Sequence, residues 1–283
     1  MKRKSVLLLT VALITAILFA LASCGSNNSK TPTGSTRDPS SSAREKLICG
    51  VTLYEPMNYK DNSDNWTGFD TEFALLVGDK LDMDVEFQLI EWSNKFFELN
   101  SGAITCIWNG FTANAEESDG TPRVDLCDMT YSYMLNQQCV VIKADRAGEF
   151  SSAASLTGKS AAVESGSAGE TAAKDLVGSG GETFGASAQI NTFMEVKSGA
   201  VDCAVVDILL AQKTVGSGDY ADLVIADIEL DSEVYAIGLK SGSDLTAKIN
   251  QAMKELYDDG TLATLAKKYG LENSLVLDTT FGR

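Results

Sequence analysis

Two consecutive stretches of this chain repeat one order of expected elements, and that order constrains the fold more than any other feature. Residues 46–112 and 160–207 each read as strand, loop, helix, strand, short helix, strand and loop. The two stretches also contain a similar hexapeptide, SGAITC at residues 101–106 and SGAVDC at residues 198–203. Strands that alternate with helices form mostly parallel sheets. The sequence therefore predicts an α/β protein with two similar, Rossmann-like lobes.

The repeat also predicts where a ligand would bind. In open α/β sheets, ligands lie beyond the carboxyl ends of the strands. The loops that end four expected strands would therefore face one another across a cleft; they follow Val51, Trp108, Val163 and Val206. Extended crossings near Cys139–Lys143 and Glu233–Leu239 would join the lobes as a two-strand hinge. We expect lobe 1 to comprise residues 44–141 plus 236–283, and lobe 2 residues 142–235.

The N-terminus has the features of an export signal. Basic residues 2–4 precede an apolar run at residues 6–22, and small residues then precede Cys24. This pattern predicts a signal peptide at residues 1–23 rather than a fold element. Its ending resembles the bacterial lipobox, which implies a lipid anchor on Cys24 and a position on the outer face of the cell membrane, or facing the periplasm if the cell has an outer membrane. An uncleaved anchor and an ordinary signal are the alternatives. Residues 24–43 are rich in Ser, Asn, Thr, Gly and Pro, which predicts a disordered, lipidated tether.

Composition excludes several functions. The chain has 283 residues, a net charge of -16 and no histidine. Without histidine the chain has no Ser-His or Cys-His nucleophile and lacks the commonest zinc ligand, which argues against most hydrolases. We expect no metal, no cofactor and no enzyme activity. The negative charge argues against nucleic acid as a partner. Five cysteines besides Cys24 lie mostly in apolar runs, which favours small buried side chains over a disulfide framework.

One arginine stands out in the stretch from Ile104 to Gln138. A short apolar strand there ends in an Asn-Gly-Phe-Thr loop, and a polar, acidic segment follows that contains Arg123. Arginine can hold a carboxylate through two parallel N–H bonds. The pattern fits a site for a small anionic group, or else a solvated loop in which Arg123 pairs with Asp119 or Asp125.

An ordered set of short motifs resembles one known family. The motifs are Tyr54-x-Pro56, Gly68-Phe69-Asp70, Trp92 ahead of Leu99-x-Ser101-Gly102, Gly110-Phe111-Thr112, Leu156-Thr157-Gly158-Lys159, Gly166-Ser167, Val205-Val206-Asp207 and Asp259-Gly260-Thr261. Together, between Leu47 and Gly270, they resemble the bacterial extracellular solute-binding proteins of the polar amino-acid type, which are receptors of ABC importers. The resemblance implies the periplasmic-binding-protein-like II fold with a ligand cleft between the lobes.

The resemblance also implies roles for individual residues. Tyr54 and Trp92 would pack around the ligand's side chain. Arg123 would grip the α-carboxylate and Asp207 would pair with the α-ammonium group. The other expected contacts are hydrogen bonds to the same two groups, from Asn109, Gly110, Thr112, Ser167 and the backbone N–H of Ala168. Glu164 lies near the cleft by register, and we include it among the expected ligand-binding residues.

One segment departs from the family pattern. Glu117 falls where the family's arginine is expected, whereas counting back from Tyr133 puts Arg123 in register. This alignment requires an insertion between Ala115 and Pro122. We assign the carboxylate site to Arg123, because a carboxylate cannot bind another carboxylate.

The implied function is that of a monomeric receptor that captures a polar amino acid and delivers it to permease subunits in the membrane. A neutral or cationic amino acid is favoured, because no second lysine or arginine is evident for an acidic side chain and the negative field disfavours anions. Two alternatives stay open: a dehydratase similar to cyclohexadienyl dehydratase, with Glu164 as its general acid, and a sensory ectodomain.

Overall fold

The computed structural model describes residues 44–281 of the chain. The expected signal peptide, Cys24 and the tether lie outside the described residues. Within the described part, no helix is long and apolar enough to cross a membrane.

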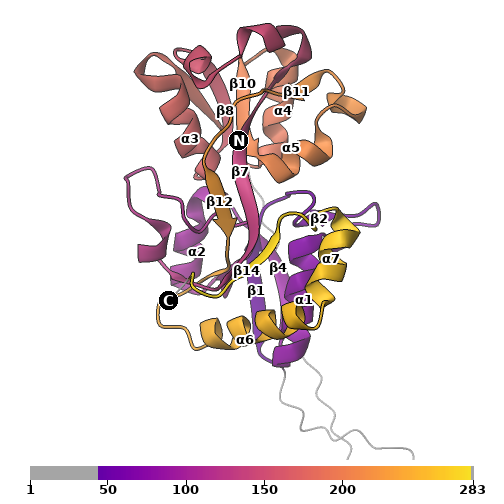
Figure 1. The fold of residues 1–283 in the computed structure, drawn as a ribbon. Helices are drawn as coiled ribbons and strands as arrows, with labels where there is room; N and C mark the ends of the chain where they lie inside the picture. The colour runs from indigo at the N-terminus through magenta and orange to yellow at the C-terminus, as the bar shows by residue number, and fades with distance from the viewer. Residues whose placement is uncertain (1–43, 282–283) are drawn as a thin grey trace, which may run out of the picture. The chain divides into compact units, whose positions relative to one another are not determined.

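The described chain forms two α/β lobes, as expected, with one sheet in each (Figure 1). The sheet of lobe 1 has the strand order β4 (Asp84–Leu89), β1 (Lys46–Val51), β5 (Cys106–Ile107), β13 (Gly238–Leu239) and β6 (Asp128–Met129). The sheet of lobe 2 has the order β11 (Leu223–Ile225), β7 (Ser132–Lys143), β10 (Cys203–Asp207), β8 (Ser160–Glu164) and β9 (Glu182–Ala186). A small hairpin of β2 (Tyr59–Lys60) and β3 (Trp66–Thr67) lies outside both sheets.

The sheets share one pairing pattern, which differs from the expected mostly parallel arrangement. In lobe 1, β1 pairs in parallel with β4 and β5, and in lobe 2, β8 pairs in parallel with β9 and β10. The remaining pairs, β5 with β13, β13 with β6, β10 with β7 and β7 with β11, are antiparallel. Both sheets are therefore mixed. The reason is that β13 and β7, which belong to the segments that cross between the lobes, run antiparallel to the βαβ strands that they join.

Helices flank the sheets. Lobe 1 has α1 (Phe69–Leu81), α2 (Lys95–Ser101), α6 (Leu245–Asp258) and α7 (Thr261–Tyr269), and lobe 2 has α3 (Ala168–Val177), α4 (Gln189–Ser198) and α5 (Ile208–Thr214). Short 3-10 turns are η1 (Trp92–Asn94), η2 (Arg123–Asp125), η3 (Ala144–Glu149), η4 (Ala153–Leu156), η5 (Gly178–Gly180) and η6 (Gly218–Tyr220). In α1, buried Phe69, Phe73 and Val77 recur at a spacing of one turn, which gives the helix a single apolar face.

An aromatic cluster fixes the start of the loop that follows Trp108. The ring centroids of Phe73 and Trp108 are 5.1 Å apart, and those of Phe73 and Tyr133 are 5.5 Å apart, both edge to face. Each such pair contributes about 0.5–1.5 kcal/mol beyond burial. The cluster joins α1, the end of β5 and β7, so it fixes the backbone where the loop after Trp108 begins.

The hinge lies slightly earlier in the chain than the sequence indicates. Strand β7 runs between the lobes, and its first half pairs with β12 (Ser232–Tyr235) and with β14 (Leu275–Asp278) (Figure 1). Cys139–Lys143, expected to be the crossing, instead pair with β10 and β11 inside the sheet of lobe 2. The strand β14 was not expected. The lobe boundaries stay predictions.

The five cysteines of the described residues are buried and free. Cys49 and Cys106 are neighbours on β1 and β5, with sulfur atoms 3.6 Å apart. The interpretation of these residues as small buried side chains is confirmed.

Candidate ligand-binding site

A small cavity lies where the two lobes meet. It is lined by Trp92, Asn109, Gly110, Thr112, Arg123, Glu164, Ser167, Ala168, Gln189 and Asp207. The lining contains every ligand-binding residue expected from the sequence except Tyr54, and it adds Gln189. The space measures about 10 Å³, roughly enough for one water molecule. The lobes are therefore closed on each other.

Arg123 lies in the cavity wall and not in a solvated loop. Only 1% of it is exposed, and its guanidinium packs over the ring of Phe111. Nε donates to Glu117 at 2.8 Å, Nη1 to the carbonyl of Thr112 at 3.0 Å, and Nη2 to the carbonyl of Gly166 at 3.2 Å. A guanidinium has five N–H groups. Among residues 44–281, these bonds leave one N–H on each terminal nitrogen available to a further acceptor such as a carboxylate.

The expected insertion is an ordered hairpin, residues 115–122. Glu117 N donates to Thr121 O at 2.9 Å, and Arg123 N donates to Ala115 O at 3.0 Å. The hairpin folds the Glu117 carboxylate inward, where it bridges Arg123 and Lys95, whose Nζ is 2.9 Å away. The hairpin thus places Glu117 beside Arg123; that the hairpin is an insertion relative to the family stays a prediction.

Lys95 is a second cation that the sequence did not single out. Its side chain is fully buried, at the start of α2, and it donates to Glu117 and to the carbonyl of Gly166, each at 2.9 Å. Burial, and then the charge of Arg123, lower its pKa to about 8. Its spacing of three residues from Trp92, one helical turn, was the signal that could have placed it near the cleft.

The start of α3 forms the opposing wall. Ser167 caps the helix by accepting from Glu170 N at 3.0 Å, which leaves its hydroxyl hydrogen for another acceptor. The N–H of Ala168 lies in the first turn, where backbone donors have no partner within the helix. Such a helix start favours an anion, and Arg123 lines the same cavity.

Asp207 is held at the end of β10 by three amides. Its carboxylate accepts from Asn136 at 2.6 Å, from Gln138 at 2.7 Å and from Gln189. Burial raises its pKa. The side-chain oxygen of Gln189 also accepts from the backbone N–H of Asp207 at 2.8 Å. Gln189 therefore holds both the backbone and the carboxylate of Asp207. An idle charge would be costly in this position.

Glu233, on the hinge strand β12, was also missed. It accepts from the same amides, Asn136 at 2.7 Å and Gln138 at 3.0 Å, and from Thr112 at 3.1 Å. Burial, and then the charge of Asp207, raise its pKa to about 7. Asn136 and Gln138 alternate along β7, and this period of two was the signal that could have placed two polar groups on one face.

Glu164 is the carboxylate with spare capacity. It ends β8, only 3% of it is exposed, and its Oε1 atom has no hydrogen-bond partner among the described residues. Burial is the largest cause that raises its pKa to about 8. A buried, half-satisfied carboxylate costs free energy unless a donor reaches it, and this oxygen is available to a donor group in the cavity.

The loop after Trp108 shapes the floor. Gly110 N donates to the buried carboxylate of Asp70 at 2.7 Å, so this N–H has a partner within the protein. The side-chain oxygen Oδ1 of Asn109 accepts from Thr52 N at 2.9 Å. Gly110 has φ +55°, and a Cβ there would lie 2.6 Å from the ring of Tyr54. Tyr54 was expected to line the cavity, but it lies behind Gly110 and does not line it. Its hydroxyl oxygen is 2.7 Å from that of Tyr235.

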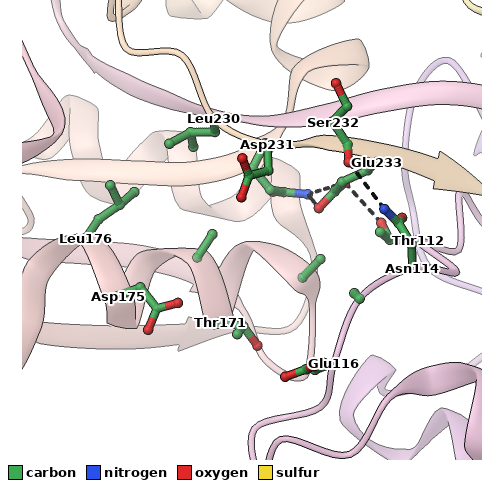
Figure 2. A pocket seen from close by; sticks show the side chains of 14 residues that line it. Thr112, Asn114, Glu116, Thr171, Asp175, Leu176, Leu230, Asp231, Ser232 and Glu233 are labelled. Atoms are coloured by element: carbon green, nitrogen blue, oxygen red, sulfur yellow. Dashed lines mark hydrogen bonds between the residues drawn. The ribbon is translucent and has the colours of Figure 1, made fainter.

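A larger hollow adjoins the cavity and shares Thr112 and Ala168 with it. Its volume is about 330 Å³, and it lies between α3 of lobe 2, the segment after Thr112 in lobe 1, and β12 (Figure 2). Its charged lining residues are all acidic: Glu116, Asp175, Asp231 and Glu233. The walls come from both lobes, so its width depends on lobe closure.

A buried polar site between two closing α/β lobes defines a two-lobed binding protein of the periplasmic-binding-protein II type. The chain belongs to the bacterial extracellular solute-binding proteins, family 3, whose model matches residues 47–272.

Individual relatives agree with this family. The arginine-binding extracellular protein ArtP of Bacillus subtilis (strain 168) is 32% identical over 270 residues, which cover 94% of this chain and 98% of ArtP. The L-cystine-binding protein TcyA of the same organism is 26% identical over 257 residues, 88% of this chain and 92% of TcyA. The structure of an ancestral arginine-binding protein bound to arginine matches with a TM-score of 0.72 and 28% identity, over 81% of this chain and 99% of that one. The expected family and fold are confirmed.

Proposed function

We propose that this protein is a receptor for a cationic amino acid. Arg123, Ser167 and the N–H of Ala168 hold the α-carboxylate, and Asp207 holds the α-ammonium group. Glu164 accepts from the cationic side chain. Trp92 and Thr112 complete the walls of the site.

The observation that carries this proposal is the buried Glu164 with its unpartnered oxygen. It stands in a charge balance that favours a cation. Arg123 and Lys95 share the single carboxylate of Glu117, whereas none of the buried carboxylates Glu164, Asp207 and Glu233 has an ion-pair partner among residues 44–281. A ligand with two positive groups and one negative group matches this arrangement, because buried charges are stable only when they are paired.

The closed lobes support capture by closure. The cavity is too small for an amino acid, so the ligand enters an open form, and contacts to both lobes then favour the closed one. The relatives support the ligand class: ArtP is named for arginine, although TcyA is named for L-cystine. As in other ABC importers, the closed receptor would dock as a monomer on the permease subunits.

A panel of amino acids tests the proposal. Thermal unfolding of the purified protein is measured with arginine, lysine, ornithine, glutamine, cystine and glutamate. A ligand at 100 times its dissociation constant stabilises the protein by about 2.7 kcal/mol. We expect arginine or lysine to give the largest shift. A largest shift with glutamate would refute the cationic ligand, and no shift with any amino acid would refute the receptor function.

Glu164→Gln tests whether Glu164 binds the cationic side chain of the ligand. The variant keeps the size of the residue and removes its charge, so binding of arginine should weaken roughly tenfold or more, because hydrogen bonds to charged groups contribute about 1.5–3 kcal/mol. Binding of glutamine should change little. Isothermal calorimetry with both ligands measures the ratio, and an equal loss for both would show that Glu164 does not contact the side chain.

Export and lipid anchoring are part of the proposal and rest on the sequence alone. Cys24 would carry the lipid, and residues 25–43 would link it to the domain. In cells given a labelled fatty acid, wild type should be labelled and sediment with membranes, whereas Cys24→Ser should be unlabelled and stay soluble. Labelling of the Cys24→Ser variant would refute the anchor.

The dehydratase alternative rests on the same carboxyl group. A glutamic acid with a pKa of about 8 holds its proton at neutral pH, as a general acid must. Incubation with arogenate and prephenate distinguishes the functions: we expect no aromatic product, and saturable turnover that Glu164→Gln abolishes would replace the receptor with an enzyme.

A further inference from the structure

Lys95, Glu117 and Arg123 form a charged bridge at the edge of the cavity. The two oxygens of Glu117 are divided between the cations: Oε1 accepts from Arg123 Nε at 2.8 Å, and Oε2 accepts from Lys95 Nζ at 2.9 Å. Both cations are buried, with 0% and 2% of their side chains exposed. Glu117 is thus the group that lets two like charges lie side by side without water.

The bridge also spans the cleft. Lys95 Nζ and Arg123 Nη2 both donate to the carbonyl of Gly166, in the turn that leads into α3. Lys95 and Arg123 belong to lobe 1 and Gly166 to lobe 2, so both bonds exist only when the lobes are closed. The same turn presents Ser167 and Ala168 to the cavity. Closure therefore brings the carboxylate-binding groups of both lobes together at the bridge.

The charge of the bridge suits one ligand carboxylate. Two cations and one carboxylate leave one positive charge beside the cavity. A second negative group, the α-carboxylate, would complete the pairing. If Glu117 were neutral, the two cations would repel each other at short range, and Arg123 would lose the bond that orients its plane through Nε.

The insertion hairpin that supplies Glu117 is attached to the hinge. Just before the hairpin, Ala113 N donates to Val234 O at 2.8 Å, and Asn114 exchanges hydrogen bonds with Ser232 O and Val234 N on β12. The base of the hairpin is thus tied to the strand that joins the lobes. This attachment keeps Glu117 at a defined depth beside the cavity.

We propose that Glu117 is a positioning residue for the carboxylate site: it fixes the guanidinium of Arg123 for the ligand and holds both cations against the Gly166 carbonyl in the closed form. The insertion is then a built-in part of the site and not a surface decoration. This inference rests on the proposed function, because it assigns Glu117 a role through the ligand's α-carboxylate.

The test compares Glu117→Gln with Glu272→Gln, a matched control whose side chain is exposed, lines neither hollow and has no ion pair within the described part of the chain. Dissociation constants are measured for L-arginine and for its α-amide, which lacks the anionic carboxylate. If arginine does not bind wild type, the tightest ligand of the amino-acid panel and its α-amide take their place. Glu117→Gln should weaken binding of the amino acid roughly tenfold to a hundredfold and of the amide far less. Glu272→Gln should leave both unchanged.

Glu117→Asp and the melting temperature of the ligand-free protein separate positioning from folding. The aspartate keeps the charge, so Glu117→Asp should bind the amino acid more tightly than Glu117→Gln does. The melting temperatures of the ligand-free variants should not fall in proportion to their losses of affinity. The inference is wrong if Glu117→Gln binds the amino acid as wild type does, if the amide loses as much affinity as the acid, or if Glu117→Asp restores nothing. If wild type binds no amino acid at all, the proposed function fails and this inference fails with it.

Discussion

At the scale of single residues, Arg123 shows what a sequence can and cannot reveal. Its register from Tyr133 was readable, and the structure places it in the cavity wall. Its partners were not readable. The pair Arg123–Asp119 or Arg123–Asp125 was as plausible from sequence as Arg123–Glu117, because spacing within a loop does not determine which carboxylate folds inward. The hairpin hydrogen bonds select Glu117.

Arg123→Ala should abolish capture while the protein stays folded. Truncating one partner of a buried charge pair costs about 2–5 kcal/mol in binding, so the affinity should fall at least about thirtyfold. Glu117 keeps its pair with Lys95 at 2.9 Å, so no carboxylate is left alone in the bridge. Calorimetry measures the binding and circular dichroism the fold.

Arg146→Ala is the matched control for that change. Arg146 pairs with Glu149 and Asp202 on lobe 2, and it does not line the cavity. Its loss should leave affinity within about twofold of wild type, since surface pairs contribute little. Normal binding by Arg123→Ala would mean that another group holds the carboxylate.

The residues that the sequence missed share one property: they act through partners that are distant in sequence. Glu233 receives hydrogen bonds from Thr112, Asn136 and Gln138. Gln189 acts on Asp207, 18 positions away along the chain. No local pattern predicts such convergence, because a polar residue in a loop or at the start of a helix has many bland explanations. The fold has to be known first.

At the scale of elements, the repeated order of strands and helices predicted the two lobes, whereas strand β14 was not predicted. β14 pairs with β7 at Met134 and Ser132. It follows α7 directly, and no second helix or repeated motif nearby indicates a strand there. Strands β1 and β5 were readable as parts of apolar runs, and β4 was readable from its alternation of apolar and polar residues. The crossing predicted at Glu233–Leu239 contains β13, whereas β6, a strand of two residues, is too short for periodicity to detect.

The turn between β8 and α3 should tolerate no side chain at Gly166. This residue has φ +75°, and a Cβ would lie 2.7 Å from the Cα of Ser93 in lobe 1. Gly166→Ala should therefore hinder closure and weaken ligand binding by roughly tenfold or more, since overpacking costs about 1–3 kcal/mol. Calorimetry gives the affinity, and small-angle X-ray scattering with ligand shows whether the lobes still close.

Gly158→Ala separates the clash from the backbone strain. Gly158 has φ +76°, but the nearest atom to its Cβ position is 3.8 Å away, in Gly180 of the same lobe. Both variants should lower the unfolding free energy of the ligand-free protein by about 1–2 kcal/mol, the cost of a left-handed alanine. Only Gly166→Ala should lose affinity. Equal affinities for the two variants would show that closure does not bring Gly166 against Ser93.

At the scale of the whole molecule, acidic groups dominate both the overall charge of the chain and its buried site. The chain has a net charge of -16, and its buried site adds carboxyl groups whose pKa values burial raises. These values are about 8 for Glu164, about 7 for Glu233 and about 7 for Asp70. Such groups make a site that is costly to keep ionised without a ligand. A cationic ligand reverses this cost, so binding and proton release are linked.

This linkage predicts how stability depends on pH. A carboxyl whose pKa is higher in the folded than in the unfolded state stabilises the fold fully below the unfolded value, about 4, and loses that contribution as the pH rises through the folded value. Between pH 5 and pH 8, the melting temperature of the ligand-free protein should therefore fall. Each such carboxyl contributes a slope of up to about 1.4 kcal/mol per pH unit.

Arginine should oppose the fall, because its cationic groups favour the ionised carboxylates. The shift in melting temperature that a fixed arginine concentration produces should consequently grow from pH 5 to pH 8. Glu164→Gln removes one titrating group, so its ligand-free protein should lose less stability over the same range than wild type. Differential scanning fluorimetry at each pH, with and without arginine, measures all three effects. A wild-type melting temperature that rises toward pH 8, or an unchanged slope in Glu164→Gln, would mean that Glu164 is already ionised in the closed cleft and that its free oxygen is not held in reserve for a cation.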